Sequence, residues 1–523
     1  MKKYFNTEKG DISSVILKVS LMLISLVIYG ILLFGRKILT VEYVIPNVIL
    51  FFATGFFAFL LIRFLNFHPP LVMSRKKENI FLGVVSVLVL AVQVFLTYNI
   101  IFRTSWDVAA VWYGSHWVSM GDAAGIQEMS EYYSIYPNNL LLVFIFSRIL
   151  KLNMMLGNHI YNGGLLLAWV QCVVINISGA ILYKCAKRFV SIRASWCAYI
   201  LYTILVGLSG WIVIPYSDGM GVIFPILLLY LYIRYKECTK QSNKYLFILF
   251  LFISGAIAYH IKPYTVIVLI AVVIIEGFEF LKTIRKQGIH SMKRALNALL
   301  VAIIGMMCSL TLITVATHSM GFSINEELER GIPHYLMLGA NVKTWGGFSE
   351  EDLAFGNNLN KKLRNQEELK EFVTRLSNMG IGGYAELFIH KAAKNFLDGT
   401  YGWESAESFY TEIYPSRGGL CDVLRSWYYG FGDLYKYNAV IRQFLWIMIL
   451  LLVPSIAYSR KTILTSEKVL ILAVLGLMLY LQIFESHARY VLTFVPLYII
   501  LALMGEKIQE KKKLKIGSTK REK

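Results

Sequence analysis

A carboxylate stands just after a long apolar segment of the sequence, where it could take a proton from a hydroxyl group. Asp107 lies in Arg103-Thr-Ser-Trp-Asp107, directly after an apolar run that ends near residue 102. A carboxylate held at the boundary between lipid and water can act as a general base toward an attacking hydroxyl group. Alternatively, Ser105 caps a helix whose dipole favours Asp107 in the first turn. The spacing alone favours neither interpretation.

Two basic residues that follow other apolar runs could bind a phosphate group. They are Lys262, in Lys262-Pro-Tyr264, and Arg489, in Glu485-Ser-His-Ala-Arg489-Tyr490. Charged side chains in or near a bilayer are costly and usually functional. Lysine and arginine there could bind a lipid phosphate and stabilise it as a leaving group. The alternative is that both side chains extend to the phosphates of ordinary lipid headgroups.

A second carboxylate, Asp218 in Pro215-Tyr-Ser-Asp218, also follows an apolar run. The residues Ser217, Asp218 and Gly219 would equally make a turn, so a role in the turn and a functional role both stay open. Histidines 116, 159, 334 and 487 have no ligand spacing such as HxxxH, and the sequence therefore predicts no metal site.

The composition places these residues in a membrane protein. Of the 523 residues, 56% are hydrophobic and 16% are charged, whereas soluble domains have roughly 45–50% apolar and about 25% charged residues. A soluble domain of this size still needs a polar surface. The hydrophobic surplus excludes an ordinary soluble enzyme and must face lipid.

Twelve apolar runs have the length of a membrane-spanning helix, about 20 residues. The expected spans are 14–34, 41–65, 79–102, 160–184, 194–214, 220–236, 245–261, 263–281, 295–316, 437–458, 467–484 and 487–505. A short apolar helix near 140–150 is expected to lie along the membrane surface instead. The region 361–377 shows the spacing of an amphipathic helix, with a second helix near 384–397 after a group of glycines.

The basic residues indicate how the spans are oriented. Residues 317–436 contain 12 Lys and Arg against 16 Asp and Glu, whereas the rest of the chain contains 40 against 17. Clusters at 75–77, 184–193, 234–244, 282–293 and 460–461 all fall on one side of the twelve spans. This is the pattern of cytoplasmic loops, so both termini are expected in the cytoplasm, and the charge of +19 does not indicate nucleic-acid binding.

These assignments divide the chain into five parts. We expect an N-terminal transmembrane hairpin with a basic cytoplasmic loop, a transmembrane core with a first extracytoplasmic loop at 103–159, an α-rich extracytoplasmic region, C-terminal transmembrane helices and a basic cytoplasmic tail. Their respective bounds are 1–78, 79–316, 317–436, 437–505 and 506–523.

The order of the motifs resembles the GT-C fold of integral-membrane glycosyltransferases, including the bacterial relatives of protein O-mannosyltransferases. An outward Asp107 after a span, a surface helix, and Tyr136-Pro-Asn-Asn-Leu140 before a short helix resemble their first extracytoplasmic loop. The motifs around Asp218, Lys262 and Arg489 resemble other outer loops. One departure is Val108, because many relatives have a second acidic residue close to the catalytic aspartate.

The resemblance implies an all-α polytopic enzyme that transfers a sugar from a polyprenyl-phosphate donor to an envelope glycan or lipid-linked acceptor. It implies Asp107 as the catalytic base and Lys262 and Arg489 as ligands of the donor phosphate. The implied substrate-binding residues are Tyr136, Asn138, Asp218, Glu485, His487 and Tyr490. No resident cofactor is expected, and the metal requirement stays open. The alternatives are a polysaccharide polymerase or ligase and a flippase or transporter of lipid-linked glycans.

Overall fold

The computed structural model describes residues 12–506, apart from 36–37, 39–42, 70, 158–162, 288, 406–408 and 461–462. Residues 1–11 and the basic tail from residue 507 onward lie outside the described residues. The cytoplasmic placement of the two termini therefore stays a prediction.

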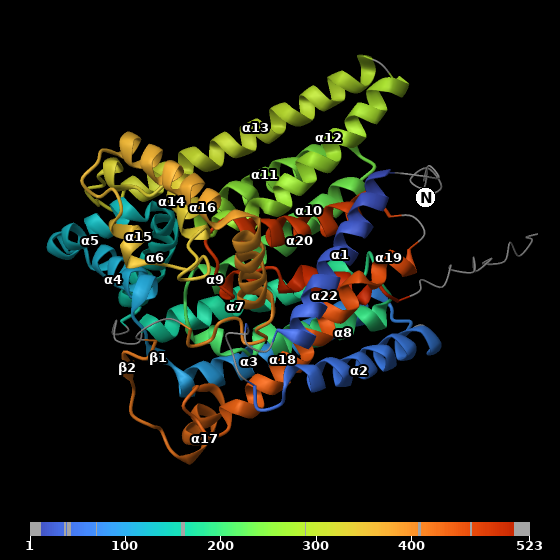
Figure 1. The fold of residues 1–523 in the computed structure, drawn as a ribbon, viewed down its shortest axis with the longest axis horizontal. Helices are drawn as coiled ribbons and strands as arrows, with labels where there is room; N and C mark the ends of the chain where they lie inside the picture. The colour runs from blue at the N-terminus through green and yellow to red at the C-terminus, as the bar shows by residue number, and fades with distance from the viewer. Residues whose placement is uncertain are drawn as a thin grey trace, which may run out of the picture.

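The body of the molecule is a bundle of long apolar helices that run along its longest axis (Figure 1). Each has the 18 or more residues and the hydropathy that a membrane span needs, in one case together with the short helix before it, Ser217–Gly221. Ten of these helices correspond to expected spans: α1 Ile12–Phe34, α2 Asn47–Phe67, α3 Arg75–Ile100, α7 Gly163–Ala186, α10 Ile223–Glu237, α11 Gln241–Ile261, α12 Ile267–Gln287, α13 Ile289–His318, α18 Tyr435–Leu452 and α20 Thr465–Ile483.

The other two expected spans are interrupted helices. Helix α8 (Ile192–Tyr202) continues as a π-helical turn at Thr203–Gly207, and the last segment consists of α21 (Arg489–Leu492) and α22 (Val495–Leu503). Both cross the bundle. Ser191, before α8, donates its N–H to the Glu506 carboxylate at 2.8 Å, whereas Trp211, beyond it, donates to the carbonyl of Thr400 at the opposite end.

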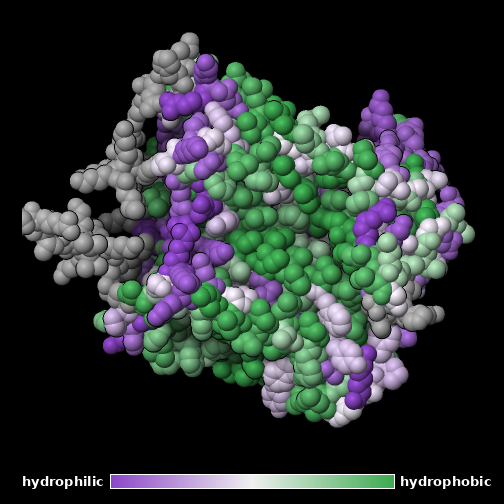
Figure 2. Space-filling model, turned by 180° about the vertical axis from the view of Figure 1, so that it is seen from behind, coloured by the Kyte–Doolittle hydropathy of each residue, from purple (hydrophilic) through white to green (hydrophobic). Residues whose placement is uncertain are grey.

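One end of the bundle collects the basic clusters, and we call it the basic end. Arg188 pairs with Glu237 at 3.1 Å, and Lys187 pairs with Glu78. Arg460 donates to the carbonyl of Phe189 at 2.6 Å, which brings a third loop to the same place. Figure 2 shows this hydrophilic band beside a broad hydrophobic belt. The gathering of basic loops at one end agrees with the sidedness deduced from the sequence.

The opposite end, which we call the loop-rich end, carries the shorter elements (Figure 1). A small antiparallel sheet pairs Phe102 with Ile413 and Arg103 with Glu412, and so joins the end of α3 to the chain before α17. The predicted helices at 361–377 and 384–397 form one element, α16, interrupted at Gly380, whose φ is 58°. The elements at this end are β1 Phe102–Arg103, α4 Trp106–Met120, α5 Ala123–Ile135, α6 Leu140–Met155, α9 Ser217–Gly221, α14 Ile332–Gly339, α15 Glu350–Ala354, the 36-residue α16 Lys361–Phe396, β2 Glu412–Ile413 and α17 Gly419–Tyr428. At the basic end α19 spans Ile456–Ser459.

Helix α6 has the length and composition of an eleventh span when the preceding turn Pro137–Asn139 is included. It nevertheless lies with α4 and α5 at the loop-rich end (Figure 1). The chain enters this region from α3 and leaves it into α7 at the same end, because Ile101 and Gly164 line one cavity. Since α6 does not carry the chain to the other end, it leaves the sidedness of the later spans unchanged.

The helices divide into a buried centre and a lipid-facing periphery. All nine residues of α22 are buried, whereas only 22% of the apolar windows in α2, α3 and α13 are buried. Large side chains such as Phe52 and Phe59 of α2 point outward and are more than half exposed. A hydrophobic surface of this extent is stable only against lipid. The described part of the chain is therefore an all-α polytopic membrane protein.

The sidedness predicts which positions an impermeant thiol reagent reaches in intact cells. In a protein whose six native cysteines are replaced, a cysteine at Glu350, exposed at the loop-rich end, should be labelled. A cysteine at Lys240, exposed between α10 and α11 at the basic end, should be labelled only after the cells are permeabilised. The reverse pattern would show that the bundle is inserted the other way round.

Candidate active site

Asp107 occupies the first turn of α4, and its carboxylate is held by two phenols. Tyr132 of α5 donates to one oxygen at 2.8 Å, and Tyr216 donates to the other at 3.2 Å. The preceding residue, Trp106, has a φ of 51°, a conformation that costs energy for a bulky residue and is common at functional sites. The Ser105 side chain makes no capping hydrogen bond to α4. Asp107 is therefore more than a first-turn residue that complements the helix dipole.

Asn139 completes this polar network, although the sequence analysis did not select it. Its side-chain N–H donates to the Tyr132 hydroxyl at 2.9 Å, and its carbonyl oxygen lies 3.4 Å from the Tyr216 hydroxyl. Asn139 is 1% exposed. A buried side-chain amide whose N–H and carbonyl groups both form hydrogen bonds fixes the orientation of the groups around it. Asn139 thus orients the two phenols that bind Asp107.

A buried ionic cluster lies beside this network. The Lys262 ammonium is 2.7 Å from one oxygen of Asp218, and Arg489 Nε is 3.6 Å from the other. The side chain of Asp218 is 2% exposed, and those of Lys262 and Arg489 are 10% and 12% exposed. Ser217 accepts a further hydrogen bond from Lys262 at 3.2 Å. Asp218 is consequently a buried counter-ion of both cations and not an exposed turn residue.

Two aromatic side chains connect the Asp107 network to the ionic cluster. The ring of Tyr216, whose hydroxyl binds Asp107, lies 5.3 Å from the Lys262 ammonium. The ring of Trp106 lies 4.4 Å from the Arg489 guanidinium and packs edge-on against Tyr216. Cations over aromatic faces are attracted by the ring quadrupole, most strongly in desolvated positions. The base candidate and the two phosphate-binding candidates therefore belong to one site.

Gln171, in the middle of the sequence of α7, positions the chain that carries Tyr216 and Asp218. Its amide donates to the carbonyl of Trp211 at 3.0 Å and accepts from the N–H of Tyr216 at 3.1 Å. A Cβ atom on Gly219 would lie 2.2 Å from its side-chain oxygen. Only glycine therefore allows the Asp218 turn to pack this closely against α7.

Residues 317–436, at the loop-rich end, fasten the loop that carries Arg489. Lys391 of α16 is fully buried and donates to the carbonyls of Gly339 and Phe484, both at 2.8 Å. Ser486 donates its N–H to the carbonyl of Gly346 at 2.7 Å. Burial, with repulsion from Lys394, lowers the pKa of Lys391 to about 7. These contacts fix residues 484–486 just before the Arg489 helix.

Glu485 and His487 lie in this loop and do not contact Asp107. Burial alone would raise the pKa of Glu485, but hydrogen bonds from His487 and Tyr490, with the charges of His487 and Arg489, lower it to about 2. The Tyr490 hydroxyl donates to Glu485 at 2.8 Å, and the Tyr490 ring lies 4.7 Å from the Lys262 ammonium. Glu485 thus orients Tyr490 against the ionic cluster.

The remaining substrate-binding candidates lie at the edge of the Asp107 network. The ring of Tyr136 packs 5.2 Å from that of Tyr132, and Asn138 contacts Asn139 at 3.5 Å. Tyr132 lies in the last turn of α5, whereas Tyr136 follows the end of that helix with a non-helical backbone and Asn139 lies in the next 3₁₀ turn. No spacing in the sequence therefore marks Tyr132 and Asn139 as parts of the Asp107 network.

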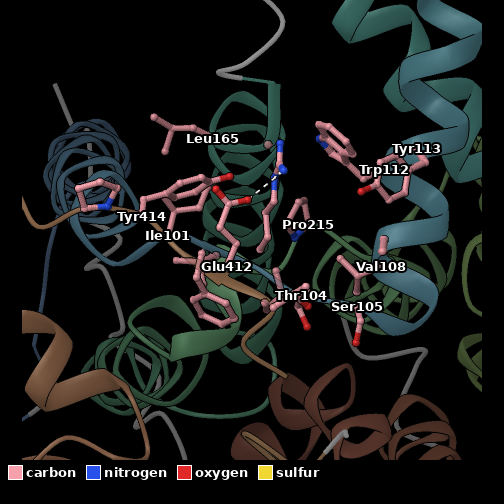
Figure 3. A pocket seen from close by; sticks show the side chains of 18 of the residues that line it. Ile101, Thr104, Ser105, Val108, Trp112, Tyr113, Leu165, Pro215, Glu412 and Tyr414 are labelled. Carbon is pink, nitrogen blue, oxygen red and sulfur yellow. Dashed lines mark hydrogen bonds and ion pairs between the residues drawn. The ribbon is translucent and has the colours of Figure 1, made fainter. Parts of the chain in front are cut away.

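A cavity of about 630 Å³ lies against another face of α4. Ser105, just before α4, and Val108 and Trp112 of α4 line one side, and Leu165 and Tyr414 line the other (Figure 3). An ion pair between Arg103 and Glu412, at 2.9 Å, borders it. Asp107 does not line the cavity, but its neighbours Ser105 and Val108 do. An open volume therefore begins directly beside the site.

No group of three or more His, Cys, Asp or Glu side chains within the described residues could hold a metal ion. The charged residues of the site are instead paired with opposite charges or phenols, as above. The cations of the site can bind an anion, and Asp107 can accept a proton.

Comparison with known proteins places the chain in a membrane protein family. No curated protein matches it. Among solved structures, it is similar to the crystal structure of ArnT from Cupriavidus metallidurans bound to undecaprenyl phosphate, with 12% identity and a TM-score of 0.30 over 83% of this chain and 78% of that chain. A similarity of this size assigns neither the detailed fold nor an activity.

A family model described as "Conserved hypothetical integral membrane protein" matches residues 13–508, which include every span and the whole candidate site. The protein therefore belongs to this family of integral membrane proteins.

Proposed function

We propose that the protein is a membrane glycosyltransferase of the GT-C type, which uses a polyprenyl-phosphate sugar as donor. The acceptor is an envelope glycan or another lipid-linked glycan on the extracytoplasmic face. The proposal rests on one observation. Trp106 and Tyr216 connect Asp107, whose carboxylate binds two phenols, to the two buried cations. A base for the acceptor and a binding site for the donor phosphate are the two parts that such a transfer needs.

The transfer consists of one bond formed and one bond broken. The acceptor hydroxyl oxygen attacks the anomeric carbon of the donor sugar, the bond from that carbon to the phosphate oxygen breaks, and the phosphate leaves with the bonding electrons. Asp107 accepts the hydroxyl proton. The two phenols that hydrogen-bond to Asp107 keep its carboxylate oriented, with remaining lone pairs for the proton.

Lys262 and Arg489 would stabilise the charge that develops on the leaving phosphate. Arg489 meets Asp218 through Nε, and within the described residues no hydrogen bond engages its two terminal nitrogens. A phosphate oxygen could therefore approach them without breaking the pair with Asp218. Preorganised donors in a water-poor site stabilise developing charge far better than in water. Asp218 would hold both cations in place between turnovers.

The sidedness supports an active site outside the cytoplasm. The candidate site lies at the loop-rich end, whereas the basic clusters gather at the other end. From the positive-inside rule we infer that the site faces the extracytoplasmic side and that both termini are cytoplasmic. A donor carried by a membrane lipid fits this location, because the ionic cluster is built from the ends of spans α11 and α21.

Comparison of envelope glycans from cells with and without the gene, by mass spectrometry, tests the activity itself. We expect one sugar increment to disappear from a defined glycan when the gene is deleted. Loss of whole repeating chains without a change in the repeating unit would indicate a polymerase or ligase instead. Unchanged glycans would contradict the proposed function.

The substitution Asp107→Asn should abolish transfer while leaving the fold intact. Asparagine keeps the shape of the side chain and one oxygen acceptor for a phenol, but the amide does not accept a proton at neutral pH. Loss of a general base typically costs about 10²–10⁴ in rate. The measurement is sugar incorporation at matched amounts of membrane-inserted protein.

Asp122→Asn is the matched control for Asp107→Asn. Asp122 caps α5 by accepting from the N–H groups of Ala124 and Gly125, and asparagine is an equally good cap. This variant should transfer sugar at a normal rate. Near-normal transfer by Asp107→Asn would remove Asp107 from the chemistry.

Substitution of Arg489 should reveal its role in binding the donor. Arg489→Ala should lower transfer by about 10²-fold, as for loss of a group that stabilises an oxyanion, while Asp218 stays paired with Lys262. Arg489→Lys should restore only part of the activity, because lysine lacks the planar fork of the guanidinium. If the transfer rate depended on donor concentration in the same way in the wild-type protein and in both variants, Arg489 would serve only the fold.

A further inference from the structure

The cavity beside α4 combines an apolar wall with a charged rim. Val108 and Ala109 from α4, Ile101 from the end of α3, and Val213 and Ile214 form the apolar wall. Its volume of about 630 Å³ lies within the usual range of roughly 300–1,000 Å³ for pockets that bind small molecules. The cavity can therefore hold a substantial apolar group.

The rim of the cavity carries a net positive charge. Arg103 and Arg417 line it together with a single carboxylate, Glu412, which pairs with Arg103 at 2.9 Å. The Arg417 guanidinium lies over the ring of Tyr98 at 3.9 Å, and no carboxylate of the described residues pairs with it. Guanidinium groups bind phosphate and carboxylate through forked hydrogen bonds. The rim is therefore suited to an anionic headgroup.

The cavity lies at the boundary between the spans and the loop-rich end. Ile101 and Leu165 come from the end of α3 and the start of α7, and Tyr98, next to the rim, points outward from α3 with 46% exposure. Helix α17 is fixed to the same place, because Arg425 donates to the carbonyl of Asn99 at 3.1 Å.

Helix α17 also presents an apolar face to the surroundings. Leu420 is 60% exposed and Val423 is 54% exposed, which continues the outward apolar surface of α3. An amphipathic helix of this kind lies in the membrane interface with its apolar face toward the acyl chains. Arg417, which lines the cavity two positions before α17 and lies over the outward Tyr98, therefore places one side of the cavity beside this apolar surface.

We propose that this cavity binds an amphiphile with an apolar chain and an anionic headgroup, which enters from the membrane leaflet beside α3 and α17. The chain lies along Val108 and Ala109, and the headgroup meets Arg103 and Arg417. The identification of this amphiphile as a substrate lipid rests on the proposed function, whereas its binding in the cavity does not. Ser105 and Pro215 line the cavity and flank Asp107 and Tyr216 in sequence, so a bound headgroup lies next to the base.

Protection of a cavity cysteine from a thiol reagent tests the proposal. In the full-length cysteine-free protein, Ala109→Cys places the thiol in the cavity, and Met120→Cys, on the same helix but exposed outside the cavity, is the control. Farnesyl phosphate at about ten times its dissociation constant should slow labelling of position 109 about tenfold and leave position 120 unchanged. Equal labelling rates at position 109 with and without the probe would overturn the proposal.

The contribution of the rim is tested by changing both the probe and the protein. Farnesol, which lacks the phosphate, should bind about tenfold more weakly than farnesyl phosphate, and Arg103→Gln with Arg417→Gln should weaken only farnesyl phosphate, by a similar factor. Lys343→Gln, which removes an exposed cation paired with Glu351 elsewhere, should change neither. If Arg489→Ala lost the protection of position 109 while the rim variant kept it, the headgroup would lie at the ionic cluster. That result would overturn the assignment.

The kinetic effect of farnesyl phosphate distinguishes the two possible sources of the amphiphile. Competition with the acceptor would identify the occupant as an acceptor lipid. Competition with the polyprenyl-phosphate sugar would identify it as the donor lipid and would assign the donor phosphate to the rim instead of to Lys262 and Arg489. Either result supports the site. Because the labelling assay needs no turnover, failure of the glycosyltransferase proposal would leave its result intact.

Discussion

The arrangement of the candidate site depends on three charges buried together at one end of a helical membrane bundle. Asp218, Lys262 and Arg489 come from α9, the end of α11 and the start of α21. Removal of such charges from water costs several kcal/mol for each ion, and only close pairing offsets this cost. The pairing at 2.7 and 3.6 Å therefore holds three separate chain segments at one point. Breaking a buried pair from one side typically costs about 3–5 kcal/mol, so the cluster resists rearrangement.

The other parts of the site are built around this cluster. Tyr216 precedes it in sequence, packs over Lys262 and donates to Asp107; Trp106 adopts an unfavourable backbone conformation and covers Arg489. From the opposite side, Lys391 ties α16 to the end of α20. The soluble-like region at 317–436 thus stabilises the loop before Arg489, which explains how a region outside the bundle can influence a site at its end.

Much of the architecture follows from hydropathy, because a bilayer requires long apolar helices whose backbone groups are satisfied internally. The same rule does not show where a span is interrupted. The expected spans at 194–214 and 487–505 contain a π-helical turn and a break between α21 and α22, both in regions packed against other helices. Length and composition alone also count α6, with the turn before it, among the spans, whereas the sequence analysis keeps the helix near 140–150 out of them; in the structure α6 lies with α4 and α5 at the loop-rich end (Figure 1).

The site was predictable to the extent that charges at span ends are unusual. Asp107, Lys262 and Arg489 stand out in the sequence for this reason, and the structure brings them into one site. Their partners do not stand out, because the contacts of Tyr132 with Asp107, of Asn139 with Tyr132 and of Ser217 with Lys262 join residues between 7 and 45 positions apart, on different elements. Such pairings depend on how helices pack, which residue type and spacing in a single sequence do not specify.

The most direct test of the account is to supply the purified full-length protein, in lipid vesicles, with a radiolabelled polyprenyl-phosphate hexose and glycolipid extracted from cells that lack the gene. The account predicts that the label moves to the acceptor and that free polyprenyl phosphate appears in equal amount. Recovery of the donor intact, whether left in place or moved across the bilayer, would contradict it.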